Sequence, residues 1–261
     1  GLISQRSQHL AFGEFSSKFA AAAKAAPFLG DPSVISSAPG THPQAVAEAG
    51  IDLYALTHNE TSTGVMMPIR RIAGADEGAL LAVDATSGAG GLPVTASEFD
   101  VYYFSPQKCF ASDGGLWIAL MSPAAIERIA CIAASGRWVP ASYDLTIALD
   151  NSRLNQTYNT PALSTIHLMT SQVEWMNNQG GLDWCVERTA DSSSRLYTWA
   201  EKTAYTSPFV ADAAERSQVI GTTDCDESVD AAAVATVRRA PGTAGTRPHP
   251  KPGHHPPHRR P

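Results

Sequence analysis

The sequence has few of the features that mark secreted, zinc-binding or membrane-spanning proteins. Its cysteines are widely spaced and form no CxxC pair, so neither a disulfide framework nor a zinc site is indicated. They are Cys109, Cys131, Cys185 and Cys225. No apolar run approaches the length of a membrane span, and the first residues lack the basic segment of a signal peptide. We therefore expect a cytoplasmic protein with reduced thiols and no membrane partner.

Acidic residues are absent from the end of the chain. Residues 238–261 contain six Lys or Arg and no acid. Because the whole chain has a formal net charge of −6, the residues before this segment carry about −12. A body this acidic argues against nucleic acid as its partner.

The same terminal segment also lacks residues that could build a core. From residue 240 onward there are seven prolines and four histidines, and no apolar side chain larger than valine. This composition predicts a disordered tail. Its basic and histidine side chains leave open a weak affinity for nucleic acid or metal, but nothing fixes a metal-binding geometry. We prefer the interpretation that a frame change in GC-rich coding sequence makes these residues arbitrary.

The informative part of the chain is a pair of short apolar runs with polar residues after them. Residues 80–83 and 101–104 are typical of buried strands in a parallel sheet. The first run is followed by Asp84, and the second by the segment SPQK, which ends in Lys108. Ligands of open α/β sheets bind outside the carboxyl ends of the strands. We therefore expect Asp84 and Lys108 to face one crevice, one strand apart.

An acid and a lysine placed in this way suit pyridoxal 5'-phosphate. This cofactor needs a lysine amine for its Schiff base, and a carboxylate that keeps its pyridine nitrogen protonated. The alternative interpretation is structural: Asp84 would cap a turn and Lys108 would lie at the edge of a loop.

Four motifs in order extend this interpretation: HNETSTG, DATSG, SPQK and NQTYNTP, at residues 58–64, 84–88, 105–108 and 155–161. Together they resemble the phosphoserine aminotransferases, class V pyridoxal-phosphate enzymes, in their actinobacterial form. The resemblance covers about residues 1–237. It implies an α/β fold of the fold-type I pyridoxal-phosphate transferases, with a mainly parallel sheet flanked by helices and an incomplete small α+β domain.

The same resemblance implies the domain boundaries. Residues 1–180 would form the large cofactor-binding domain, incomplete at its start, where the family has a glycine-rich turn that cradles the cofactor phosphate. Residues 181–237 would be a linking helix and part of the small domain, and residues 238–261 the tail. The family continues its small domain there, with basic residues that bind the substrate.

Site residues are also implied by the resemblance. Lys108 would be the catalytic residue that holds the cofactor, and Asp84 would pair with the ring nitrogen. Phe15 would stack on the ring, Thr61 would donate a hydrogen bond at the side of the ring, and Gln107 would contact the phosphate. Without the resemblance, Phe15 reads as a core residue and Thr61 as a turn residue. We assign no chemical role to Glu60, and we interpret His58 as a structural histidine rather than a base.

Two further residues are expected to act across a subunit boundary. By resemblance, Asn159 and Thr160 reach the cofactor phosphate of the other subunit, so the active site would require a homodimer. The structural alternative is an ordinary helix start, with Thr160 as N-cap and Pro161 at the first helical position.

The implied reaction is amino transfer between phosphoserine and 2-oxoglutarate, giving 3-phosphohydroxypyruvate and glutamate in the biosynthesis of serine and pyridoxine. Two alternatives stay open. The chain could be a truncated, frame-changed remnant that neither binds the cofactor tightly nor turns over. It could also be another class V aminotransferase.

Local patterns predict the remaining elements. We expect strands at residues 10–12, 33–36, 51–58, 115–121 and 217–224. We expect helices at residues 16–26, from 123, at 160–178, at 181–202 and from 228. The helix from residue 123 should bury a stripe that contains Ile126, Ile129 and Ala130. Residues 138–151 should form a long loop.

Overall fold

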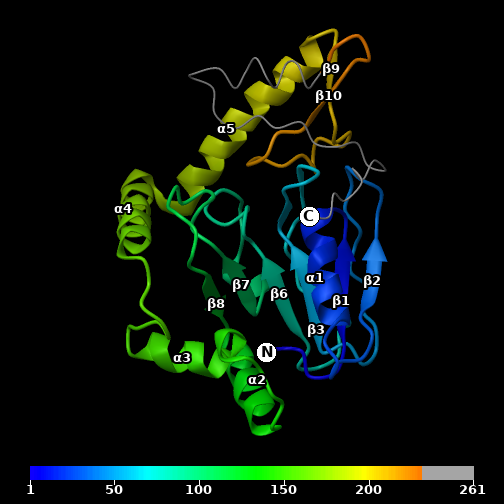
Figure 1. The fold of residues 1–261 in the computed structure, drawn as a ribbon. Coiled ribbons are helices and arrows are strands. Elements are labelled where there is room, and N and C mark those ends of the chain that lie inside the picture. The colour runs from blue at the N-terminus through cyan, green and yellow to red at the C-terminus, as the bar shows by residue number, and fades with distance from the viewer. Residues whose placement is uncertain (231–261) are drawn as a thin grey trace, which may run out of the picture.

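A six-stranded sheet in the order β2-β1-β3-β6-β7-β8 organises the computed structural model, which describes residues 1–230 (Figure 1). The first five strands are parallel, and β8 runs antiparallel to β7. The strands are β1 (Ser7–Ala11), β2 (Ser33–Ser36), β3 (Leu53–Thr57), β6 (Leu80–Asp84), β7 (Val101–Phe104) and β8 (Ile118–Met121). The carboxyl ends of the parallel strands therefore lie at one common edge.

In residues 1–230, five α-helices accompany the sheet: α1 (Glu14–Lys24), α2 (Pro123–Ala134), α3 (Leu145–Arg153), α4 (Leu163–Gln179) and α5 (Gly181–Lys202). Figure 1 shows α1 lying against one face of the sheet. None of these helices, within residues 1–230, is apolar enough over a sufficient length to cross a membrane.

Each face of the sheet packs against its own apolar cluster. Side chains alternate along a strand, so Leu80 and Ala82 of β6 point to the face that carries Phe19 of α1. The odd-numbered residues of the same strand pack on the opposite face, with a larger cluster that includes Phe12 and Tyr102. By this alternation, the last residue of β6, Asp84, faces the side of α1.

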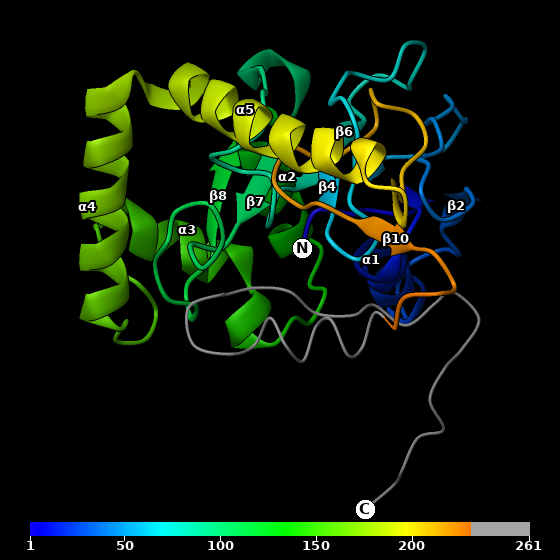
Figure 2. The same cartoon turned by 90° about the horizontal axis from the view of Figure 1, so that it is seen from above.

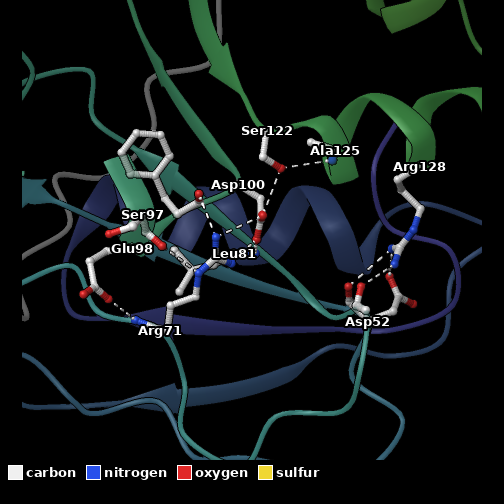
Figure 3. A network of polar contacts seen from close by, with 11 residues as sticks. Asp52, Arg71, Leu81, Ser97, Glu98, Asp100, Ser122, Ala125 and Arg128 are labelled. Carbon is white, nitrogen blue, oxygen red and sulfur yellow. Dashed lines mark hydrogen bonds and ion pairs between the residues drawn. The ribbon is translucent and has the colours of Figure 1, made fainter. Parts of the chain in front are cut away.

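The amino edge of the sheet is held by two ion pairs (Figure 3). Arg128 of α2 pairs with Asp52 just before β3 at 3.1 Å. Arg71 pairs with Asp100, just before β7, and the buried Asp100 carboxylate also accepts the N–H of Leu81 (2.9 Å) and the hydroxyl of Ser122 (2.9 Å). Burial raises the pKa of Asp100, but hydrogen bonds from these three partners outweigh it and hold the pKa below the usual value.

The Asp100 network makes a stability prediction. We expect Asp100→Ala to lower the free energy of unfolding by about 2–4 kcal/mol at pH 7, because it leaves buried donors unpaired. The folded-state pKa is depressed, so this contribution is present above the unfolded pKa and is lost as pH falls below it. Urea unfolding measures the change. Asp150→Ala, at an exposed ion pair with Arg153, is the control and should change little; an equal effect of both variants would contradict the prediction.

The carboxyl edge is partly covered by the last described segments (Figures 1 and 2). Thr189 of α5 donates a hydrogen bond to the carbonyl of Gly91 in the loop after β6 (2.7 Å). The antiparallel pair β9 (Thr206–Pro208) and β10 (Thr223–Cys225) follows α5. Thr222, just before β10, donates to the carbonyl of Thr63 (3.0 Å), between the short strands β4 (Asn59–Glu60) and β5 (Val65–Met66).

Many predicted elements are confirmed, with some ends shifted. The strands at 33–36 and 101–104 and the helix at 181–202 have the expected bounds. The first helix covers Glu14–Lys24 rather than 16–26, and the strand expected at 51–58 is Leu53–Thr57. The strand expected at 115–121 begins only at Ile118. Most of the helix expected from 228, and the tail, lie outside the described residues; 228–230 are not helical.

Three local expectations are wrong. Residues 138–151 are not a loop throughout, because Asp144 caps α3 by accepting the N–H of Thr146 (2.8 Å). The strand expected at 217–224 is reduced to Thr223–Cys225, because the Ser217 hydroxyl accepts two backbone N–H groups and forms a turn.

The third error concerns the face of α2. This helix buries Ala125, Ile129 and Ile132, so Ile129 of the expected stripe is confirmed, whereas Ile126 is half-buried and Ala130 is exposed. The Ser122 hydroxyl binds both Asp100 and the N–H of Ala125, which sets the rotation of the first turn against the sheet.

Candidate active site

Asp84 and Lys108 follow neighbouring parallel strands, as the sequence predicted. Asp84 is the last residue of β6 and pairs in register with Tyr103 of β7. It is half-buried, and its Oδ1 accepts the N–H of Thr86 at 2.9 Å. Lys108 is exposed in the loop after β7. Both side chains therefore belong to the carboxyl edge of the sheet.

Tyr103 is a partner of Asp84 that the sequence analysis missed. Its hydroxyl hydrogen-bonds to the Asp84 carboxylate. Burial, and then the negative charge of Asp84, raise the pKa of Tyr103 well above its usual value. Tyr103 therefore stays a neutral hydrogen-bond donor and holds the Asp84 carboxylate in its orientation. Their pairing across two strands could not be read from either motif alone.

Ser87 links two of the four motifs to each other and to the residue that follows a third, SPQK. Its buried hydroxyl accepts hydrogen bonds from Asn59 Nδ2 (2.9 Å) and Thr61 Oγ1 (2.8 Å), and it donates to the Asn59 carbonyl (3.1 Å). Its own carbonyl accepts the Cys109 thiol at 3.6 Å, next to Lys108. The segments that carry Thr61, Asp84 and Lys108 therefore meet here. The only signal for Ser87 in the sequence was its place in the turn after Asp84.

Cys109 is not an activated nucleophile, although it adjoins Lys108. Burial, followed by the neighbouring Cys185, raises the pKa of the Cys109 thiol. A reactive cysteine needs the opposite, a lowered pKa. We therefore assign Cys109 a packing contact with Ser87 and no chemistry.

Phe15 lies in the first turn of α1 and is 46% exposed, so it is not a core residue. The Lys18 ammonium lies 5.7 Å from the centre of its ring. The backbone N–H of Phe15 donates to the buried carboxylate of Glu60, the residue before Thr61. The first turn of α1 is thereby tied to the segment that carries Thr61.

Gln107, Asn159 and Thr160 are not drawn into this cluster. Gln107 is exposed, with its side chain near Gly114 in the loop before β8. Asn159 and Thr160 are exposed in the connection between α3 and α4, along the β8 side of the molecule (Figure 1). The contacts within one chain therefore join the segments of Phe15, Thr61, Asp84 and Lys108, and leave Gln107, Asn159 and Thr160 outside this cluster.

Thr160 is not the helix cap that its sequence suggested. The N-cap of α4 is Ala162, which makes no side-chain cap bond, and the helix begins at Leu163. The first turn of α4 is fixed instead by tertiary contacts of Thr165. The carbonyl of Thr165 accepts the Ser112 hydroxyl (2.7 Å), and the hydroxyl of Thr165 donates to the Gly114 carbonyl (3.5 Å). These contacts tie α4 to the loop that follows Lys108.

His58 is a buried structural histidine. Its Nδ1 lies 3.0 Å from the Tyr102 hydroxyl, and the carbonyl of Pro93 is a second partner. Burial lowers the pKa of His58 to about 4, and it lowers the pKa of His9 in β1 to about 4 as well. Both rings are therefore neutral in the folded protein at neutral pH.

These two histidines predict acid sensitivity. Their folded-state pKa values lie below the unfolded value of 6.5, so the unfolded chain binds more protons between about pH 4 and 6.5. Stability should therefore fall as pH drops through this window, by about 2 kcal/mol per histidine between pH 7 and 5. Urea unfolding at both pH values tests this. His58→Gln should remove part of the dependence; an unchanged slope in that variant would contradict the assignment.

The donor set at this edge fits pyridoxal phosphate. An exposed amine, a half-buried carboxylate and a hydroxyl follow adjoining strands, and an exposed aromatic ring begins the neighbouring helix. Asn59 Oδ1, beside Thr61, is buried without a hydrogen-bond partner among residues 1–230, so the edge keeps an unused acceptor. Lys108, Asp84, Thr61 and Phe15 could hold the pyridine ring and its substituents.

Comparisons with known proteins agree with this geometry. The family model described as aminotransferase class V matches residues 41–243. A phosphoserine aminotransferase of Nocardioides sp. is 63% identical over 254 residues, which is 97% of this chain and 68% of that protein. The corresponding enzyme of Rhodococcus jostii is 60% identical over 253 residues, again 97% of this chain and 68% of the relative.

Among solved structures, a phosphoserine aminotransferase from Cytophaga hutchinsonii matches with a TM-score of 0.76 and 26% identity. The match covers 83% of this chain and 61% of that one. The chain therefore spans about two thirds of the length of the relatives that it resembles in sequence.

Proposed function

Because this chain belongs to the class V aminotransferase family, we propose that it catalyses amino transfer between O-phospho-L-serine and 2-oxoglutarate, giving 3-phosphohydroxypyruvate and glutamate. The observation that carries the proposal is the junction at Ser87, where the segments of Thr61, Asp84 and Lys108 meet. The names of relatives that are about 60% identical support the choice of substrate. This reaction belongs to the biosynthesis of serine, and we extend the proposal to that of pyridoxine.

Pyridoxal phosphate, the cofactor of this family, supplies an electron sink for the amino acid substrate when it is bound. The Lys108 amine would hold the cofactor covalently. When released by the substrate, the neutral Lys108 amine would move a proton between the substrate Cα and C4′ of the cofactor, first as base and then as acid. Its exposed position in the loop after β7 suits both roles.

The remaining residues would orient the ring. Asp84 would accept a hydrogen bond from the ring nitrogen and keep it protonated, while Thr86 N–H and Tyr103 hold the carboxylate in place. Thr61, whose hydroxyl donates to Ser87 in this structure, would donate to the ring side after its hydroxyl turns away from Ser87. Phe15 would stack on the ring.

We propose that the working form is a cytoplasmic homodimer, in which Asn159 and Thr160 of one subunit and Gln107 of the other contact the cofactor phosphate. The exposure of all three supports this assignment. A groove of about 420 Å³ between β8 and α4 adjoins this segment and is lined by Trp117, Ile166 and other residues. Trp117 is 52% exposed there, and exposed apolar surface of this kind is typical of interfaces.

We also propose a domain boundary near residue 180, with residues 1–180 as the cofactor-binding domain and 181–237 as a linking helix and partial small domain. The six-stranded sheet ends at Met121, and α5 leads to the separate pair β9 and β10, which supports the division.

A donor panel tests the proposed reaction. Glutamate formation from 2-oxoglutarate is measured with phosphoserine, serine and alanine as donors, in the presence of pyridoxal phosphate. We expect phosphoserine to be preferred by roughly 10²-fold or more, because a site built for a charged group discriminates strongly against ligands without it. Activity with alanine or serine but none with phosphoserine would indicate another class V aminotransferase. A folded chain that is inactive with all donors would be a remnant of the enzyme.

A further inference from the structure

Glu60 is a fully buried acid beside the proposed cofactor site. It ends β4, and its exposed fraction is 0%. Its Oε2 accepts the N–H (2.8 Å) and the hydroxyl (2.8 Å) of Ser16. Its Oε1 accepts the hydroxyl (2.7 Å) and N–H (3.2 Å) of Ser62 and the N–H of Phe15 (3.3 Å). These hydrogen bonds replace the water that a buried carboxylate loses.

The carboxylate of Glu60 serves as the cap of α1. The first N–H groups of a helix have no partner within it, and the N-cap residue, Gly13, has no side chain to offer. Glu60 accepts two of these N–H groups, and the helix dipole favours its charge at this end. Gly13 leaves the necessary room, since a Cβ there would lie 2.4 Å from Glu60 Cγ.

The same carboxylate connects two side chains that we assign to the cofactor. Phe15 lies in the capped turn, and Thr61 directly follows Glu60 in the chain. Ser62 strengthens the connection, because its hydroxyl donates to Glu60 and accepts the N–H of Glu14 (2.9 Å). Since the ring of Phe15 is 46% exposed, its direction depends on the backbone of this turn more than on packing.

We propose that Glu60 is a positioning residue for the cofactor ring. Its carboxylate fixes the first turn of α1, so that Phe15 is held at a set position relative to Thr61. This inference rests on the proposed function, and it goes further by naming a residue that acts on the cofactor only through its neighbours. A role in folding alone would change stability without changing how tightly the cofactor is held.

Glu60→Gln is the decisive variant, because it keeps the size of the side chain and places an amide N–H₂ where the carboxylate accepts backbone N–H groups. We expect the Kd for pyridoxal phosphate, measured on the full chain by absorbance titration, to rise about tenfold. Without cofactor, the amides of residues 15 and 16 should exchange with solvent faster than in the wild type. Glu127→Gln, at an exposed acid on α2, should change neither.

A double-mutant cycle with Phe15→Leu separates positioning from folding. If Glu60 acts through Phe15, Glu60→Gln should weaken cofactor binding by less than about twofold in the Phe15→Leu background. Gly13→Ala provides a second route, because the added methyl group displaces an intact Glu60. Gly13→Ala should reproduce the faster amide exchange and the weaker cofactor binding. It therefore tests the inference even if the Glu60→Gln variant does not fold.

The outcomes distinguish this inference from the proposed function. Faster amide exchange with unchanged cofactor affinity, or penalties of Glu60→Gln and Phe15→Leu that simply add, would overturn the positioning role and leave the proposed function intact. A folded wild-type chain that does not bind pyridoxal phosphate would contradict the proposed function, and this inference with it.

Discussion

Lys108→Ala should abolish aminotransfer while the chain stays folded. The side chain is exposed in the loop after β7 and can be removed without opening a cavity. Its amine is assigned both the covalent hold on the cofactor and the proton transfer at the substrate Cα. Loss of general acid–base catalysis alone costs roughly 10²–10⁴-fold in rate, so we expect kcat to fall by roughly 10³-fold or more.

Two measurements check this expectation. Glutamate formation gives the rate, and borohydride reduction followed by mass spectrometry shows whether cofactor is fixed to the peptide that contains residue 108. Lys108→Arg keeps the positive charge and should be as inactive as Lys108→Ala, since its guanidinium cannot act as the amine. Lys24→Ala, at the exposed end of α1, is the control. Retained turnover in Lys108→Arg, or fixation of cofactor to another lysine, would contradict the assignment.

Asp84→Asn should give the second large effect. The substitution preserves shape and keeps an oxygen for the N–H of Thr86, but it removes the charge that would keep the ring nitrogen protonated. A hydrogen bond to a charged group contributes about 1.5–3 kcal/mol, so kcat/KM should fall by roughly 10–100-fold. Steady-state kinetics with phosphoserine measures the loss, and Asp150→Asn, at an exposed pair on α3, should behave as the wild type.

A readout without cofactor accompanies this variant. Asp84 is the second cause, after burial, of the raised pKa of Tyr103. In Asp84→Asn the pKa of Tyr103 should therefore fall toward its ordinary value, while burial still keeps it raised. NMR signals of ring-labelled tyrosines at neutral pH follow the loss of this contact. Unchanged Tyr103 ring signals together with unchanged kinetics would show that Asp84 does not face the site.

The strands and the long helices could be predicted because their signals are local. Residues 80–83 and 101–104 are short apolar runs, and α5 carries an amphipathic pattern over its whole length. The placement of Asp84 and Lys108 on neighbouring strands followed from these runs and from the rule that ligands bind at carboxyl ends. The roles of these residues stay predictions that the variants test.

The parts that could not be predicted depend on partners far away in the chain. The role of Glu60 as a buried cap could not be predicted, because its donors Phe15 and Ser16 lie 45 and 44 residues earlier in the chain. Thr160 followed by proline has the local signature of a helix start, yet contacts of Thr165 with the loop after Lys108 fix the beginning of α4. The helix α3 buries none of its residues, so its only local signal was the cap, Asp144.

The most direct test of the account is a titration of the purified full chain with pyridoxal phosphate, followed by visible absorption, with Lys108→Ala alongside. The account predicts a visible band in the wild type that saturates at one cofactor per chain, is absent in Lys108→Ala and changes when phosphoserine is added. A soluble, folded wild-type chain with no such band would contradict the central claim, and the likeness to aminotransferases would then describe ancestry alone.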